Sequence, residues 1–114
     1  MKFVAAFALM LSSVTASAMA GDVSAGSHIA QTWCKGCHNI SPQANIMHDT
    51  GAPPFAVVAN SKGTTSTGLT IFLYTSHHRM PDYSLTRKEA ADVSAYIMSL
   101  REQAPALAGR DPVR

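Results

Sequence analysis

The segment Cys34-Lys35-Gly36-Cys37-His38 constrains this chain more than any other feature, and its two cysteines are the only ones in the sequence. Two thiols three positions apart can add across the two vinyl groups of one protoporphyrin ring. The next residue, His38, can then place its imidazole under the iron. The spacing of Cys34, Cys37 and His38 therefore predicts a covalently attached c-type haem with His38 as its proximal ligand.

Other uses of a C-x-x-C pair fit the sequence less well. A thioredoxin-type redox motif follows a strand in a βαβ unit, and nothing in this chain alternates as strands do. A structural disulfide would have to close a very tight loop. A structural zinc site needs four ligands, and the histidines that could complete one do not have the usual H-x-x-x-H spacing: His28, His48, His77 and His78.

The first residues are typical of a secretion signal. Lys2 precedes a nine-residue apolar run from Phe3 to Leu11, and Ala18-Met19-Ala20 fits a small-residue cleavage site. A membrane-spanning helix needs about 20 apolar residues, whereas serine and threonine interrupt this run after Leu11. We therefore predict cleavage before Gly21, with cleavage after Ala18 as the alternative. The mature protein would then be periplasmic, without stable membrane insertion.

The expected organisation is a signal peptide (1–20), one domain (21–102) and a flexible C-terminal tail (103–114). A domain of this size buries only a modest core by itself, so a haem would supply much of the apolar interior. Without Lys2, eight lysines and arginines stand against seven acidic residues, a formal charge of +1. Two ionised haem propionates would bring the ferric protein close to neutral. The absence of a basic run argues against a nucleic acid partner.

Helix signals are strongest at the two ends of the domain. We predict a first helix over 22–37, with Asp22 as its N-cap and Gly26 at a close helix–helix contact. Thr86 and Glu89 form a capping box for a last helix. The apolar residues of that helix recur at spacings of three and four, namely Ala90, Val93, Ile97 and Leu100.

Between these helices, a third predicted helix leads to Met80. Its N-cap is expected around Ser66 or Thr67, and it ends near Ser76, before the sequence Met80-Pro81. Pro81 favours an extended conformation for Met80, so the thioether is presented on a loop. An iron with His38 on one face needs a ligand on the other, and Met80 is our candidate. The two residues that remain alternative ligands are His77 and His78.

The whole pattern resembles the class I c-type cytochromes, small soluble mono-haem electron carriers, from Gly21 to about Arg101. In that family a glycine eight residues before the first cysteine, here Gly26, lies where the first and last helices cross. An aromatic residue packs on this contact, and Tyr96 fits that place. The family also implies that Pro53 presents its carbonyl group to the proximal histidine.

The resemblance implies further haem contacts and shows three departures, one of which is a short loop between Leu73 and Met80. Phe55 corresponds to an apolar wall of the haem pocket, and the loop at Met80 resembles the methionine-ligand loop of bacterial members. Ala30 stands where an aromatic residue is usual, so the crossing could be looser, or Ile29 and Trp33 could fill the gap. The pair His77-His78 is also uncommon. The residues expected to contact haem are Cys34, Cys37, His38, Pro53, Phe55, Phe72 and Met80.

The fold implied by the resemblance is all-α, with three main helices and loops around one covalently bound haem c. The implied function is electron transfer and not enzyme catalysis, with one iron cycling between Fe(II) and Fe(III) under His38 and Met80 ligation. The expected partners of this monomer are periplasmic redox proteins: a dehydrogenase, a bc1-type complex, or a terminal oxidase or reductase. The alternatives are a haem subunit of a larger periplasmic oxidoreductase and a gas- or peroxide-reactive haem protein.

Overall fold

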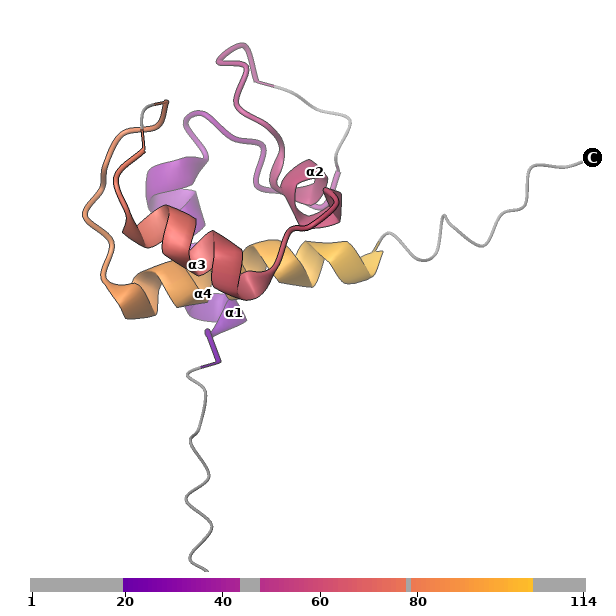
Figure 1. Ribbon diagram of the computed structural model, residues 1–114. Coiled ribbons are helices and arrows are strands. Elements are labelled where there is room, and N and C mark those ends of the chain that lie inside the picture. Colours follow the sequence, from indigo (N-terminus) through magenta and orange to yellow (C-terminus); the bar gives the residue numbers. More distant parts are fainter. Residues whose placement is uncertain (1–19, 44–47, 78, 104–114) are drawn as a thin grey trace, which may run out of the picture.

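The computed structural model describes residues 20–43, 48–77 and 79–103 (Figure 1). Nearly all of the predicted signal peptide and C-terminal tail lie outside these residues, as does His78. The elements in chain order are α1 (Val23–Ile29), a π-helical segment η1 (Ala30–Cys34), α2 (Phe55–Asn60), α3 (Ser66–Tyr74), α4 (Arg87–Ser99) and a 3-10 segment η2 (Leu100–Gln103). The described residues contain no strand, which confirms the all-α prediction. The short α2 adds a fourth α-helix to the three expected.

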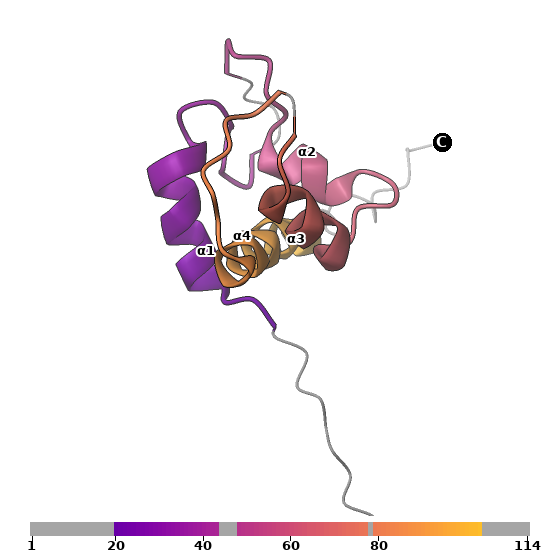
Figure 2. The ribbon, with the colours of Figure 1, turned by 60° about the vertical axis from the view of Figure 1, so that its left-hand side comes forward.

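Helix α4 is the element against which the others pack. Helices α1 and α3 make their main contacts with it, and they lie on different sides of it (Figure 2). The loops before α2 and before α4 rise on the same side of this helical base (Figure 1). The buried apolar residues gather around α4: Ala30, Phe55, Ala59, Val93, Ile97 and Leu100.

The predicted capping box of α4 is confirmed. The Thr86 hydroxyl accepts a hydrogen bond from the Glu89 N–H, and the Glu89 carboxylate accepts one from the Thr86 N–H. Both donors would otherwise lack a partner at the start of the helix. The predicted apolar face also forms, because Ala90, Val93 and Ile97 are buried on one side of α4. Local sequence signals are therefore sufficient to place this helix.

The first predicted helix is correct at its start and wrong in its second half. Asp22 is the N-cap, since its carboxylate accepts from the Ala25 N–H at 2.7 Å. The α-helix ends at Ile29, however, and the chain continues as the π-helical η1. There the Lys35 N–H donates to the Ala30 carbonyl oxygen at 3.0 Å, which is the bond of a wider turn. This turn changes the helical register immediately before the first cysteine.

The bounds of α3 also differ from the prediction. Its N-cap is Thr65, not Ser66 or Thr67, because the Thr65 hydroxyl accepts from the Gly68 N–H at 3.0 Å. The helix ends at Tyr74, two residues before the expected end at Ser76. Thr75 is extended there, and its hydroxyl donates to the Ile71 carbonyl oxygen at 2.7 Å, which satisfies a carbonyl group at the helix end.

The crossing of α1 and α4 brings two backbones into direct contact at Gly26, as predicted. A Cβ atom on Gly26 would overlap the carbonyl oxygen of Asp92 and would lie 3.0 Å from the Tyr96 Cβ. Ala30, one turn further along, is completely buried, whereas Trp33 is 51% exposed and does not fill the place of the usual aromatic residue. The small residues Gly26 and Ala30 thus allow a close crossing.

A buried carboxylate ties the start of α1 to α4 at the same crossing. Asp92 accepts from the Asp22 N–H at 2.8 Å and from the Lys88 ammonium group at 2.8 Å. Burial by itself would raise the pKa of Asp92, but the hydrogen bond and charge of Lys88, together with the Asp22 N–H, hold this pKa below its ordinary value. Asp92 is therefore ionised in the folded protein at neutral pH.

We expect Gly26→Ala to lower the free energy of unfolding by about 2–4 kcal/mol, because a backbone atom stands where the new methyl group would be. Urea titration followed by far-UV circular dichroism measures this loss. The control is Ser24→Ala, an exposed position on the same helix, which should change the free energy by less than about 0.5 kcal/mol. An unchanged unfolding midpoint for Gly26→Ala would contradict the close crossing.

We expect Asp92→Asn to destabilise the protein by up to about 1 kcal/mol at pH 7, because the new amide keeps an acceptor for the Asp22 N–H but loses the charge that pairs with Lys88. The pKa of Asp92 is lower in the folded than in the unfolded protein. Its contribution is therefore complete above the unfolded pKa and is lost as the pH falls through the folded one. Urea titrations at several pH values should show the difference from wild type shrinking below about pH 4. A difference independent of pH would contradict this role.

Candidate haem site

The turn after η1 brings His38 to a backbone carbonyl group. The backbone N–H of His38 donates to the Cys34 carbonyl oxygen at 2.9 Å. The ring Nδ1 of His38 lies 2.7 Å from the carbonyl oxygen of Pro53. A carbonyl oxygen can only accept a hydrogen bond, so in the neutral ring the hydrogen is on Nδ1 and Nε2 keeps its lone pair. This is the tautomer that a metal-binding histidine needs. The contact between His38 and Pro53 is the one that the resemblance implied.

Two hydrogen bonds hold the Pro53 loop against the cysteine segment. The Thr50 hydroxyl donates to the Cys37 carbonyl oxygen at 2.6 Å, and the Phe55 N–H donates to the Asn39 carbonyl oxygen at 2.9 Å. These bonds lie on either side of Pro53 in the sequence. The orientation of the His38 ring is thus set by the fold and not by the histidine alone.

An aromatic stack connects His38 to α4. The buried Phe55 ring lies 5.2 Å from the His38 ring and 6.4 Å from the Tyr96 ring, measured between ring centres. The Tyr96 hydroxyl donates to the Ile40 carbonyl oxygen at 2.6 Å, which satisfies its polar end. Phe55 therefore forms an apolar wall beside His38 and links it to the helix crossing.

All seven residues expected to contact haem line one cavity of about 740 Å³. This volume is within the usual range of ligand sites, roughly 300–1,000 Å³. The cavity wall also has a large aliphatic share, from Ile29, Val58, Leu69, Leu73, Leu85 and Ile97. Two thiols, a histidine with a free lone pair, a methionine and an apolar lining fit the chemistry of a c-type haem.

Burial affects one of the two thiols. It raises the pKa of Cys34 to about 11, whereas Cys37 is exposed. These thiols occupy the positions of the two thioether sulfurs of a haem-bearing protein. Before attachment, Cys34 is therefore a thiol and not a thiolate at neutral pH.

Met80 lines the cavity from a loop whose two sides are joined by hydrogen bonds. The Asp82 carboxylate accepts from the Ser84 N–H at 2.8 Å and from the Ser76 hydroxyl at 3.0 Å, so it joins the two sides of the loop around Met80. These bonds lower the pKa of Asp82. The Tyr83 ring packs on Trp33, with 5.3 Å between ring centres, which fixes the loop to η1. The Met80 loop is thus restrained by the Asp82 hydrogen bonds within it and by the packing of Tyr83 on Trp33 of η1.

The sequence prediction missed Asp82 and the ring pair of Trp33 and Tyr83. The segment Asp82-Tyr83-Ser84 does contain a signal, since aspartate commonly accepts from a backbone N–H two residues later. Of the alternative ligands, His77 lines the cavity, whereas His78 lies outside the described residues. In the described part of the chain, no three His, Cys, Asp or Glu residues gather as a metal site, so the zinc interpretation gains no support.

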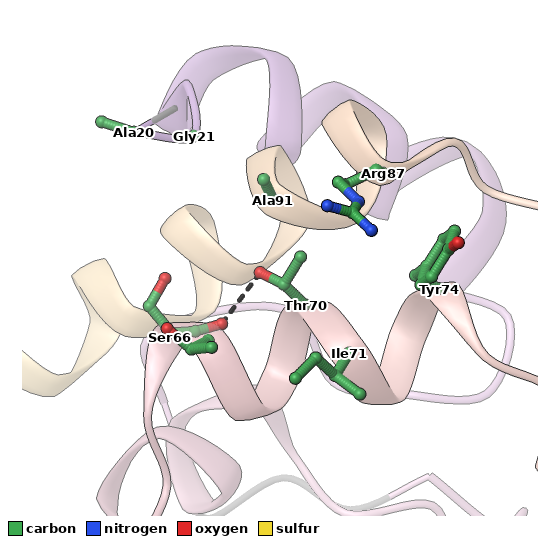
Figure 3. Close-up of a pocket in the computed structure, with 9 residues that line it drawn as sticks. Ala20, Gly21, Ser66, Thr70, Ile71, Tyr74, Arg87 and Ala91 are labelled. Atoms are coloured by element: carbon green, nitrogen blue, oxygen red, sulfur yellow. Dashed lines mark hydrogen bonds between the residues drawn. The ribbon is translucent and has the colours of Figure 1, made fainter. Parts of the chain in front are cut away.

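A second cavity, of about 420 Å³, lies between α3 and the start of α4 (Figure 3). Within it, the Thr70 hydroxyl donates to the Ser66 carbonyl oxygen at 2.9 Å. The Arg87 guanidinium lies 5.3 Å from the centre of the Tyr74 ring. The described residues that line this cavity include no cysteine, histidine or methionine. It therefore offers none of the side chains that attach and ligate a haem in the proposed site.

The family model for cytochrome c matches residues 23–101, which include the cysteine motif, the Met80 loop and α4. The chain belongs to the cytochrome c family. It is 38% identical over 93 residues to cytochrome c-552 of Bradyrhizobium diazoefficiens, an alignment that covers 82% of this chain and 88% of that protein. No solved structure gives a significant match.

Membership of the cytochrome c family decides the nature of the cofactor. This small bacterial class I cytochrome is an electron-transport protein with covalently bound haem c, and Cys34 and Cys37 have the spacing for its attachment. The thioredoxin, zinc and disulfide interpretations of the two cysteines are therefore set aside. No helix of the described residues is long and apolar enough to cross a membrane.

Proposed function

We propose that this cytochrome is a periplasmic electron carrier whose iron cycles between Fe(II) and Fe(III) with His38 and Met80 as axial ligands. One observation carries the proposal: His38 and Met80 line the same cavity as both cysteines. A single chain can therefore attach the haem and supply both axial ligands. With both axial positions filled, no substrate binds at the iron.

The haem supplies the one-electron chemistry, and the residues around it set the conditions. The Pro53 carbonyl oxygen orients the His38 ring. By accepting the hydrogen bond from Nδ1, it also makes Nε2 a stronger electron-pair donor to the iron. The Met80 thioether and the apolar lining favour the ferrous form, so the potential is higher than with two histidines. Asp82 and Tyr83 restrain the Met80 loop, which keeps the ligand set unchanged between the two oxidation states.

Location and partners are part of the same proposal. The sequence 1–20 has the charged start, the apolar run and the cleavage site of a secretion signal. The expected charge of the mature ferric protein is close to zero, so long-range electrostatic steering contributes little to partner binding. Partners would dock mainly on apolar surface near the haem edge, with local charges such as Lys35 and Arg79.

Met80 ligation is tested by spectroscopy. The ferric wild type should show the weak near-infrared charge-transfer band of sulfur bound to iron. Met80→Ala should lose this band and lower the reduction potential, within the roughly 0.8 V range that axial ligands span. The control is Met98→Leu in α4, which should keep the band. Rapid carbon monoxide binding by the wild type would instead indicate an open iron face and favour the gas- or peroxide-reactive alternative.

Export and partner choice are tested on the protein in its native cell. Periplasmic extracts should contain a chain that begins at Gly21 and carries one haem by mass spectrometry. Periplasmic dehydrogenases, a bc1-type complex or terminal oxidases should exchange electrons with it, at rates that fall only mildly as ionic strength rises. Recovery in the cytoplasm would contradict the location. A steep salt dependence would show that clustered charges control docking.

A further inference from the structure

His77 is held by the backbone in the same way as the proximal histidine. Its ring Nδ1 lies 2.8 Å from the carbonyl oxygen of Thr75, and the corresponding distance from His38 to Pro53 is 2.7 Å. Because the carbonyl oxygen can only accept, the neutral His77 ring carries its hydrogen on Nδ1. Its other nitrogen, Nε2, then has no hydrogen and keeps the lone pair with which a neutral imidazole binds a metal.

The position of His77 Nε2 is unusual for a ring nitrogen. The atom is buried, and it has no hydrogen-bond partner in the described part of the chain. Buried polar atoms almost always have a partner, so one without a partner needs a physical reason. The ring packs on Phe72, with 3.9 Å between ring centres, and His77 lines the same cavity as Met80 and His38. Its orientation is therefore fixed by Phe72 and Thr75.

We propose that His77 is a reserve axial ligand, whose Nε2 binds the haem iron when Met80 does not. The inference rests on the proposed His38 and Met80 ligation and extends it. The exchange breaks the bond from iron to the Met80 sulfur and forms a bond from iron to Nε2. No electron is transferred and no proton leaves, because Nδ1 keeps its hydrogen bond to Thr75. Both ligands come from the segment that follows α3, and because Nε2 is buried, the exchange requires a shift of that segment which uncovers this atom.

The exchange has a functional consequence. A cytochrome that loses Met80 ligation and has no substitute exposes an iron face to carbon monoxide, cyanide or peroxide. With His77 bound, the iron stays six-coordinate and closed, at a lower potential. The protein then stops working as a high-potential carrier without becoming a peroxide-reactive centre.

The experiment compares haem-bearing Met80→Ala with Met80→Ala/His77→Phe. Phenylalanine keeps a ring against Phe72 but has no nitrogen. Met80→Ala should be low-spin by electron paramagnetic resonance, with the signal of two histidines, and the double variant should become high-spin. After reduction to the ferrous state, the double variant should also bind carbon monoxide at least roughly ten-fold more tightly than Met80→Ala, because no internal ligand competes. Added imidazole should return it to the low-spin form, which shows that the site is folded.

The control is Met80→Ala/His78→Ala, which should stay low-spin and closed. The proposal is overturned if Met80→Ala is already high-spin, if the His77→Phe double variant stays low-spin, or if removal of His78 is what opens the iron. The near-infrared band of wild type and of His77→Phe alone tests the Met80 ligation separately. If both show the band while Met80→Ala is high-spin, the carrier function stands and the reserve ligand is wrong. If wild type lacks the band and His77→Phe opens the iron, His77 is the main ligand and both proposals fail.

Discussion

The backbone contact between α1 and α4 at Gly26 is the constraint on which the haem site depends. It fixes the direction of the first helix, and therefore where η1 delivers Cys34 and the turn that follows. The same α4 carries Tyr96, which packs on Phe55, and Phe55 packs on His38. His38, the proposed proximal ligand, is thus positioned from two directions, by the cysteine segment and by the aromatic stack. A change in the crossing angle of α1 and α4 would therefore displace both the cysteine segment and the aromatic stack.

The apolar interior of this protein is divided between a small side-chain core and the haem cavity. The core is built from alanines and a few larger residues around α4, as expected for a domain too small to bury much surface. Ile97 belongs to this core and also lines the cavity, so the haem continues the same apolar interior. Two thioethers hold the haem to the chain. The cofactor is therefore a structural component as well as the redox centre.

Local sequence signals predicted the parts of the fold that depend on near neighbours. The Asp22 cap, the capping box at Thr86 and the apolar face of α4 need only residues within a few positions. Gly26 was interpretable because a glycine inside a helix costs stability unless another backbone lies close. The π-helical η1 was not predictable in this way, because its bonds replace α-helical bonds without any change in residue type. The hydrogen bond between Ser76 and Asp82 and the packing of Trp33 on Tyr83 depend on loop geometry that no periodicity encodes.

The ring Nδ1 of His38 and that of His77 each contact a backbone carbonyl oxygen. The two rings differ in how closely the chain would hold them to the haem, and this difference fits their proposed roles. His38 follows Cys37 directly, so attachment of the haem at Cys37 would keep the His38 ring close to the iron. His77 has no such tether and must compete with Met80 for the opposite face. Thioether sulfur is a soft ligand that favours Fe(II), whereas imidazole nitrogen competes better for Fe(III). Under the proposed ligation, the restraints that Asp82 and Tyr83 place on the Met80 loop therefore act against this preference in the ferric state. The hydrogen bonds of Asp82 with Ser76 and Ser84 would then help the oxidised protein to remain a methionine-ligated carrier.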